Sequence, residues 1–423
     1  MKKKLWLIIA LCVVMAATMS LAACGGGATE EPAAEEPAAE EPAAEEPAAE
    51  ETTAEEPAAG GDNLQASKDL MLDLESVKGS DGQSLLIYGE SRAVPARPDD
   101  PDSLSDEDPL KYWDIEYAGR ETQKEPAIES PGDGCIGKKV IAIGQSEHPY
   151  WTAVFNGATT ASTALQMELT TWNPNGDLNQ QNQLIDKAIA EKPDLIMLSP
   201  LDAKASAQQF KKIYDAGIPA IAYNMVPSDE AMKYVLVLTA PDDFGQFKML
   251  GDYVANDVGG TAGVCYMTHL PGGSPYFARY SNVRAFYAEN YPDMKYLDHQ
   301  SPGFEAPKAK QVVADWITKY GDDLNVIVLA DDSAQAEGCA QAIAEAGRDD
   351  IKVIAAGNSK VGMDLVNSGG LFAITYQSAE ADGAIAIRAA AEYFNGESLD
   401  PCYYLPQAVI TKTNVADYEP AQW

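Results

Sequence analysis

The sequence predicts an α/β fold of two lobes, each a doubly wound parallel sheet covered by helices. From Lys139 onward, strand-like and helix-like segments alternate with short connections, which is typical of parallel sheets with helical crossovers. Eleven segments have strand character, more than one doubly wound sheet of ordinary size contains. We therefore expect two lobes, one formed by residues 136–240 and 378–405 and the other by residues 241–377 and 406–423.

The strands are expected where short apolar runs end at turn residues. The first run, residues 139–144, contains Val140, Ile141 and Ile143, whose β-branched side chains suit a strand that is buried on both faces. The same criterion places the other strands at residues 168–172, 194–198, 219–223, 234–239, 262–267, 294–299, 325–330, 352–357, 371–376 and 407–411.

The helices between these strands are marked by their ends. Asp177 is placed to cap one helix, with Gln180 three residues later completing a capping box. Residues 203–216 carry Phe210 on an apolar face and are followed by Gly217, which is typical of a helix end.

The helix after the first strand begins near a proline. Pro149 excludes the preceding His148 from the helix, so Tyr150 and Trp151 are expected in its first turn. In open α/β sheets, ligands bind at the carboxyl ends of the strands. This aromatic pair is therefore a candidate part of a site.

The amino terminus has the features of an export signal. Lys2, Lys3 and Lys4 precede an apolar run and a Leu21-Ala-Ala-Cys24 box, an order typical of bacterial lipoproteins. The apolar run is shorter than the roughly 20 residues that span a membrane. We expect residues 1–24 to be a signal peptide and Cys24 to carry a lipid anchor after export.

Residues 25–63 contain Glu-Glu-Pro-Ala-Ala five times and are expected to form a disordered, extended linker. Twelve of its glutamates contribute to the net charge of −35. The rest of the chain is still acidic, which argues against nucleic acid as a partner. Residues 64–135 are expected to form an irregular extension that packs on the main fold and contains a short helix near Leu70 and Leu74.

Four cysteines remain after export and acylation. Cys265 and Cys339 are expected to be small buried side chains. Cys135 and Cys402 flank the folded region, so a disulfide between them is one possibility.

No set of residues indicates catalysis or a metal site. The three histidines are far apart in the sequence, and no Gly-x-Ser-x-Gly motif occurs. The pairs Asp242-Asp243 and Asp331-Asp332 follow predicted strands and suit acid–base chemistry, helix capping or hydrogen bonding to a ligand. We favour ligand binding for one member of each pair, and we expect no cofactor.

Several motifs, taken in order, resemble the ribose-binding family of periplasmic substrate-binding proteins. The resemblance spans about residues 138–415 and rests on His148-Pro-Tyr-Trp151, Asn173-Pro-Asn-Gly-Asp177, Pro193-Asp-Leu-Ile-Met-Leu-Ser-Pro200, Ala216-Gly-Ile-Pro-Ala-Ile221, Gly251-Asp-Tyr253, Leu329-Ala-Asp-Asp332 and Val366-Asn-Ser-Gly-Gly370. It implies a type I clamshell, in which three crossover segments join two lobes that close over a sugar.

The resemblance also implies the ligand-binding residues. At least one ring of Tyr150 and Trp151 would stack on the apolar face of a sugar. The other implied contacts are aromatic, or planar groups that form two hydrogen bonds to hydroxyls. They are His148, Asp243, Arg279, Phe304, Asp331, Asn358 and Gln377.

One position departs from the family pattern. Sugar binders of this family usually carry an Asp-Arg pair after the fourth strand, where this chain has Asn224-Met225. A neutral amide and a thioether replace a charged clamp. We expect Asn224 and Met225 to contact a ligand that differs from a plain pentose or hexose at this edge, such as a methylated, deoxy or bulkier sugar, or a non-sugar molecule.

The sequence thus predicts a lipid-anchored solute-binding protein on the outer face of the cytoplasmic membrane. We expect it to bind a small polar ligand, a monosaccharide or derivative, and to pass this ligand to the permease of an ABC importer. Alternatives are a sensor that presents its ligand to a membrane receptor kinase and an exported enzyme acting on glycosides. A DNA-binding repressor is excluded by the export signal and by the lack of a helix-turn-helix segment before Lys139.

Overall fold

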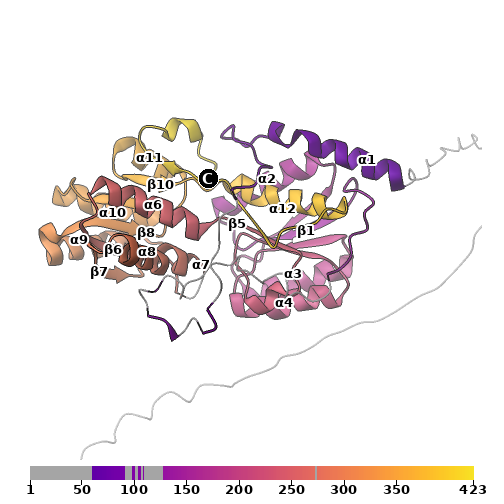
Figure 1. The fold of residues 1–423 in the computed structure, drawn as a ribbon, viewed down its shortest axis with the longest axis horizontal. Coiled ribbons are helices and arrows are strands. Elements are labelled where there is room, and N and C mark those ends of the chain that lie inside the picture. The colour runs from indigo at the N-terminus through magenta and orange to yellow at the C-terminus, as the bar shows by residue number, and fades with distance from the viewer. Residues whose placement is uncertain (1–59, 91–97, 101–102, 106–107, 109–126, 272–273) are drawn as a thin grey trace, which may run out of the picture. The chain divides into compact units, whose positions relative to one another are not determined.

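The computed structural model describes residues 60–90, 98–100, 103–105, 108, 127–271 and 274–423. They belong to one compact unit that spans residues 56–423. The expected signal peptide, Cys24 and most of the expected linker lie outside the described residues. Within these residues the strands form two six-stranded sheets, so the two-lobed α/β fold is confirmed (Figure 1).

The amino-terminal lobe is built on a fully parallel sheet with the order β11-β5-β4-β3-β1-β2. Its strands are β1 (Lys139–Ile143), β2 (Glu168–Trp172), β3 (Leu195–Leu198), β4 (Ala220–Tyr223), β5 (Val237–Ala240) and β11 (Cys402–Tyr404). Its helices are α2 (Pro149–Ala164), α3 (Leu178–Glu191), α4 (Ala203–Asp215), α5 (Asp229–Met232) and α12 (Ala379–Phe394).

The carboxy-terminal lobe has the sheet order β12-β10-β9-β8-β6-β7, with only β12 antiparallel to its neighbour. Its strands are β6 (Ala262–Met267), β7 (Met294–Gln300), β8 (Leu324–Leu329), β9 (Lys352–Ala355), β10 (Ala373–Thr375) and β12 (Val409–Ile410). Its helices are α6 (Asp243–Asp257), α7 (Ser274–Tyr276), the π-helical turn η5 (Phe277–Ser281), α8 (Asn282–Asn290), α9 (Ala306–Tyr320), η6 (Gly321–Asp323), α10 (Ala334–Ala346), α11 (Lys360–Ser368) and η7 (Val415–Tyr418).

Each predicted strand corresponds to a strand of the structure, but β11 was not predicted. This strand has only three residues, too few for an apolar pattern, and it forms the edge of its sheet beside β5. The predicted cap is confirmed, since Asp177 accepts hydrogen bonds from the backbone N–H groups of Asn179 and Gln180. Gly217 has a φ of 75°, as expected after α4.

The chain passes between the lobes three times. It leaves the amino-terminal sheet after β5, returns between β10 and α12, and leaves again between β11 and β12. The parallel strands after which it crosses all end at the same edge of their sheets. The side chains at these crossings are therefore brought to the boundary between the lobes.

Two glycines allow α2 and α12 to pack with their backbones in contact. A Cβ on Gly157 would lie 1.8 Å from the carbonyl oxygen of Glu380, and one on Gly383 would lie 2.0 Å from that of Val154. This packing sets the amino-terminal turns of the two helices, with Tyr150 and Asp382, side by side.

Replacing Gly383 by alanine is expected to lower the free energy of unfolding by about 2 kcal/mol or more, because the new methyl group meets backbone that cannot move aside. Urea unfolding measures the loss. Gly370→Ala is the matched control, since the one close contact of its Cβ, at 2.9 Å, is with the end of the Leu365 side chain and the nearest backbone atom is 3.7 Å away. Equal free energies of unfolding for the two variants would show that the backbones of α2 and α12 can move apart to accept the methyl group.

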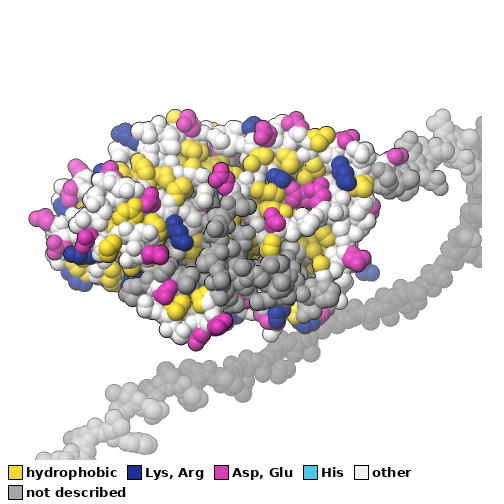
Figure 2. Space-filling view, viewed as in Figure 1, with side chains coloured by type: hydrophobic (Ala, Val, Ile, Leu, Met, Phe, Trp, Pro, Cys, Tyr) yellow, Lys and Arg dark blue, Asp and Glu magenta, His cyan; other side chains and the backbone are white. Residues whose placement is uncertain are grey.

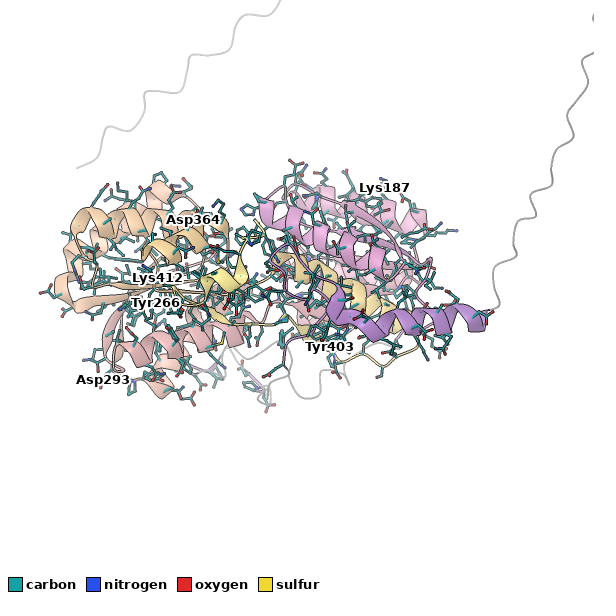
Figure 3. The ribbon with its side chains drawn as sticks, turned by 90° about the horizontal axis from the view of Figure 1, so that it is seen from above. Lys187, Tyr266, Asp293, Asp364, Tyr403 and Lys412 are labelled. Atoms are coloured by element: carbon teal, nitrogen blue, oxygen red, sulfur yellow. The ribbon has the colours of Figure 1, made fainter. Side chains whose placement is uncertain are left out.

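The expected extension begins earlier than predicted. Helix α1 (Gly60–Leu70) starts within residues assigned to the linker and continues into η1 (Met71–Ser76). It is fixed to the amino-terminal lobe by Ser67, whose Oγ accepts hydrogen bonds from the backbone N–H groups of Cys135 and Ile136. Further along, the ring of Tyr88 stacks on that of Tyr403 with centroids 4.0 Å apart. Tyr403 is labelled in Figure 3.

The four remaining cysteines are buried. Among the described residues no disulfide joins Cys135 to Cys402, because the first lies in the core on the α2 and α12 side of the sheet and the second in the core on the opposite side. The pairing that the sequence left open is therefore not formed.

Charged side chains are distributed over the surface without a basic stripe on the visible face. In Figure 2 acidic side chains lie on both lobes and basic ones stand singly among them. In the part of the chain that the structure describes, none of the helices has the length and apolar character needed to cross a membrane.

Candidate ligand-binding site

A cavity of about 350 Å³ lies where the carboxyl ends of the strands of both lobes meet. All the predicted ligand contacts except Asn358 line it. The lining residues are Gln145, Ser146, His148, Tyr150, Trp151, Asn224, Met225, Pro241, Asp243, His269, Pro275, Arg279, Phe304, Ala330, Asp331, Ser333, Ala356, Gly357, Gln377 and Trp423. Both lobes and two of the crossover segments therefore contribute to one site.

The Tyr150 hydroxyl is the centre of a hydrogen-bond network at the base of the cavity. It donates to Oδ2 of Asp382 at 2.6 Å and accepts from the side-chain amides of Asn224, at 3.1 Å, and Gln377, at 3.2 Å. Asn224 also donates to the same Asp382 oxygen at 2.5 Å. The network ties the amino-terminal lobe to the crossover at Gln377.

Asp382 is fully buried in the first turn of α12, and its second oxygen, Oδ1, has no partner. Burial raises the pKa of Asp382 to about 7, although the hydrogen bonds from Tyr150 and Asn224 oppose the rise. Burial and the nearby Asp382 carboxylate raise the pKa of Tyr150 well above its usual value, so the phenol keeps its proton.

Asn224 has a left-handed backbone, with a φ of 63°. Asparagine tolerates this conformation better than most residues because its short side chain forms local hydrogen bonds. The turn directs the amide inward to Asp382 and Tyr150, and it leaves the apolar Met225 side chain on the cavity wall.

Arg279 and Asp243 form a forked ion pair on the carboxy-terminal side. Nε and Nη2 of Arg279 donate to Oδ1 of Asp243 at 3.1 and 2.8 Å, and Nη1 donates to the carbonyl of Ala330 at 2.8 Å. Nη2 also reaches Oε1 of Gln377 at 3.4 Å. The two side chains neutralise each other's charge. Each is 13% exposed, and both line the cavity.

The two aspartate pairs divide their roles. Asp243 and Asp331 line the cavity, whereas Asp242 caps α6 by accepting from the backbone N–H of Gly245. Asp332 is fully buried and accepts from the backbone N–H of Ser359 at 2.7 Å. Burial, with Asp331 beside it, raises the pKa of Asp332 well above its usual value.

The aromatic side chains differ in how much surface they offer. Trp151 is 5% exposed and packs edge-on against Tyr223, so most of its ring belongs to the core. Phe304 is 44% exposed and meets His269 edge-on, with centroids 4.9 Å apart. Burial and Arg279 lower the pKa of His269 to about 4, so this imidazole is neutral near pH 7.

Asn358 is not at the cavity surface, in contrast to the prediction. It is fully buried, and its Oδ1 accepts a hydrogen bond from the backbone N–H of Gln377 at 3.2 Å. Gly357 lines the cavity in its place, with a φ of 105° that turns the chain inward at the next residue.

A comparison with protein families identifies the fold. The family described as "Periplasmic binding protein domain" matches residues 139–398, which is more than half of the chain. The chain belongs to this family of periplasmic binding proteins. The resemblance seen in the sequence is thereby confirmed, and helix α1, η1 and the residues up to 138 precede the matched region.

Its curated relatives are binding proteins rather than enzymes. The xylitol-binding protein of Mycolicibacterium smegmatis is 25% identical over 261 residues, which are 61% of this chain and 73% of the relative. The ribose import binding protein of Escherichia coli is 21% identical over 273 residues, covering 64% and 90%. These relatives support the prediction that this periplasmic binding protein is not an enzyme.

Solved structures share the fold. A solute-binding protein of Bacillus halodurans with bound myo-inositol has a TM-score of 0.59 and 20% identity, covering 68% of this chain and 99% of that one. A protein of Actinobacillus succinogenes with bound D-allose has a TM-score of 0.60 and 23% identity, covering 66% and 100%.

Several residues of this periplasmic binding protein that line the cavity or support its lining were not predicted. Asp382 lies in a helix whose other residues are almost all apolar or small and buried, and a carboxylate in such a helix is itself a signal of a buried polar site. Trp423 had no such signal, because it follows a short irregular segment. The other unpredicted lining residues are Gln145, Ser146, Pro241, His269, Pro275, Ala330, Ser333, Ala356 and Gly357.

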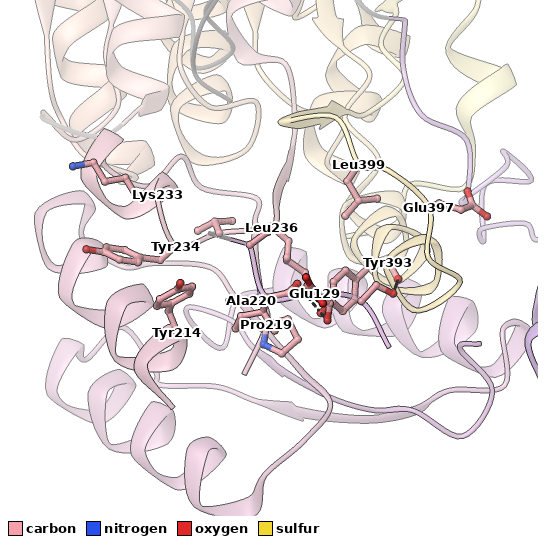
Figure 4. Close-up of a pocket in the computed structure, with 14 residues that line it drawn as sticks. Glu129, Tyr214, Pro219, Ala220, Lys233, Tyr234, Leu236, Tyr393, Glu397 and Leu399 are labelled. Carbon is pink, nitrogen blue, oxygen red and sulfur yellow. Dashed lines mark hydrogen bonds between the residues drawn. The ribbon is translucent and has the colours of Figure 1, made fainter. Parts of the chain in front are cut away.

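A second cavity, of about 260 Å³, lies in the amino-terminal lobe (Figure 4). Pro219, Ala220 and Leu236 line it at the amino ends of β4 and β5, the edge of the sheet opposite to the ligand cavity. Nowhere in the described ranges do three or more His, Cys, Asp or Glu side chains form a group that fits a metal ion.

Proposed function

We propose that this periplasmic binding protein captures a small neutral sugar or polyol in the cavity between its lobes. The observation that carries the proposal is the convergence of aromatic rings and planar hydrogen-bonding groups from both lobes on one cavity of about 350 Å³. A sugar ring has an apolar C–H face that suits an aromatic wall, and its hydroxyls suit carboxylate, amide and guanidinium groups.

A neutral ligand fits the charges of the site. The Arg279 guanidinium is already paired with Asp243, and Asp331 accepts hydrogen bonds from the Ser333 hydroxyl and the Gln335 backbone. A charged ligand would have to displace these pairs, whereas hydroxyl groups add to them. The remaining lone pairs and N–H groups supply both donors and acceptors.

The ligand is expected to hold the two lobes together. Domain closure follows when a ligand contacts both lobes, because it then binds the closed state more tightly than the open state. Tyr150 and Asn224 act from one lobe, Arg279 and Phe304 from the other.

The edge of the ligand near Asn224 and Met225 is expected to be less polar than in a plain pentose or hexose. The Asn224 amide is already engaged with Asp382 and Tyr150, and Met225 offers no hydrogen bond. A deoxy, methyl or bulkier apolar group fits here. The names and bound molecules of the relatives, which include xylitol, ribose and D-allose, support a polyhydroxylated ligand in general terms.

We also propose that the protein serves an ABC importer and is tethered to the outer face of the cytoplasmic membrane through Cys24. The support for the tether is the Leu21-Ala-Ala-Cys24 box after a basic and apolar amino terminus.

Cys24→Ser is expected to move the protein from the membrane fraction to the soluble fraction of the expressing cells, because it removes the acylated thiol. Immunoblots of fractionated cells measure the change. Cys12→Ser, before the box, is the control and leaves the protein in the membrane fraction. Membrane association of both variants would contradict the lipid anchor.

A thermal-shift panel tests the binding function itself. The panel contains ribose, D-allose, xylitol, myo-inositol and their deoxy and methylated derivatives. A true ligand at about 100 times its Kd stabilises the folded state by about 2.7 kcal/mol and raises the Tm. A panel without any shift would overturn the assignment to sugars and polyols.

A further inference from the structure

The last residues of the sequence fold back over the junction of the two lobes. We call residues 415–423 the tail segment. Val415 is buried in the core of the carboxy-terminal lobe, and the ring of Tyr418 packs against that of Tyr376, with centroids 4.7 Å apart. Near its end, Oε1 of Gln422 accepts hydrogen bonds from the Ser378 hydroxyl and the Glu380 backbone at the start of α12. The tail segment is therefore held on both sides of a crossover.

Trp423 of the tail segment lies between the lobes. Its main-chain oxygen accepts a hydrogen bond from the backbone N–H of Lys360 at 2.7 Å, which fixes it to the carboxy-terminal lobe. Its ring meets Tyr150 edge-on at a centroid distance of 5.3 Å and His148 at 5.7 Å, both at the start of α2. The ring packs beside the turn at Gly357, where a Cβ would lie in van der Waals contact with it, 3.4 Å from Cζ2 of Trp423.

The indole N–H of Trp423 is buried and has no partner. A buried donor without an acceptor is destabilising, so such groups are normally paired. Trp423 lines the cavity beside Tyr150. The Tyr150 hydroxyl already forms hydrogen bonds to Asp382, Asn224 and Gln377. A ligand oxygen in the cavity would supply the missing acceptor.

We propose that Trp423 is a specificity-determining ligand contact, which offers a ring to the apolar face of a cyclic polyol and its indole N–H to a ligand oxygen. The proposal rests on the proposed function, because it assigns a further residue to the same site. It adds an aromatic wall supplied by the tail segment, outside the region that matches the family. The tail segment contacts both lobes, so the position of the Trp423 ring in the cavity depends on how the two lobes are placed relative to each other.

Calorimetric titration of Trp423→Phe and Trp423→Ala tests the proposal, with the tightest-binding cyclic member of the thermal-shift panel as the probe. Trp423→Phe keeps a ring but loses the N–H, and it is expected to bind about three- to tenfold more weakly, the value of one hydrogen bond. Trp423→Ala loses both and is expected to bind about thirtyfold more weakly or worse.

A second readout separates a ligand contact from a structural role. Trp423→Ala is expected to lose affinity for the cyclic probe more than for the open-chain polyol xylitol, so the Kd for the cyclic probe divided by the Kd for xylitol rises. Glu419→Gln is the matched control, because it weakens a bond of the tail segment to Asn367 while leaving the ring in place. It is expected to keep both affinities.

Two outcomes would overturn the proposal. The first is a Kd of Trp423→Ala within about twofold of the wild type, which is below the value of a single contact. The second is an equal loss for both polyols, which would assign the tail segment a purely structural role. In either case the wild-type protein binds its ligand, so the failure of this proposal is distinct from a failure of the proposed function, in which the wild type binds no member of the panel.

Discussion

Replacing Arg279 by alanine is expected to weaken sugar binding by about a hundredfold or more and to lower the free energy of unfolding by about 3 kcal/mol. The affinity falls because charge-assisted hydrogen bonds to the ligand are lost. The stability falls because the Asp243 side chain is left in a largely buried position without its ion-pair partner. Calorimetric titration and urea unfolding of the same preparation measure the two effects.

Arg348→Ala is the matched control for this variant. Arg348 is also largely buried and forms hydrogen bonds to Asp350 and to the carbonyls of Gly321 and Leu324, but it lies outside the cavity. Its loss is expected to lower stability without changing the Kd. If Arg279→Ala bound sugar as tightly as Arg348→Ala, Arg279 would not belong to the ligand site.

Asp382→Asn is expected to change how stability depends on pH. The pKa of Asp382 in the folded protein is about 7, above the value of about 3.9 for an unfolded aspartate. The folded state therefore holds the proton more tightly, so the contribution of Asp382 is fully present below about pH 4 and is lost as the pH rises to about 7. By linkage, the free energy of unfolding of the wild type falls by about 4 kcal/mol over this pH range because of Asp382. The Asn variant has no such titrating group and lacks this fall.

Urea unfolding of both proteins at about pH 4.5 and about pH 8 tests this expectation. Asp382→Asn keeps an oxygen that can accept from Tyr150 and Asn224, so its stability relative to the wild type is expected to be greater at the higher pH. Asp364→Asn, on the exposed face of α11, controls for the loss of a carboxylate. A stability difference that stays constant between the two pH values would mean that Asp382 is ionised normally in the folded protein.

The fold was largely predictable because its signals are local. Runs such as Val140, Ile141 and Ile143 mark strands buried on both faces, and caps such as Asp177 mark the helices between them. The edge strand β11 was missed because three residues carry no periodic pattern. The start of α1 was missed because Gly60 and Gly61 resemble the linker before them, while the contacts that hold the helix, such as Ser67 with Cys135, join residues far apart in the sequence.

The candidate site was predictable where a residue directly follows a strand. Asn224, Asp243 and Asp331 come within three residues of a strand end and line the cavity for this reason, whereas Tyr150 was found from the proline that starts α2. Asn358 was misassigned because the left-handed turn at Gly357 buries the next side chain, and sequence alone does not locate that turn to a single residue.

Long-range contacts account for the residues that were missed. Asp382 reaches Tyr150 and Asn224 across separations of 232 and 158 residues. Trp423 enters the cavity only because the tail segment folds back over a crossover. No local pattern encodes either contact, so both required the tertiary structure.

The most direct test of the account is native mass spectrometry of the full-length protein with the best ligand of the thermal-shift panel. The account predicts one neutral sugar or polyol bound per chain, with binding lost in Arg279→Ala and retained in Arg348→Ala. A protein that binds no polyhydroxylated molecule, or that binds one equally well without Arg279, would contradict it.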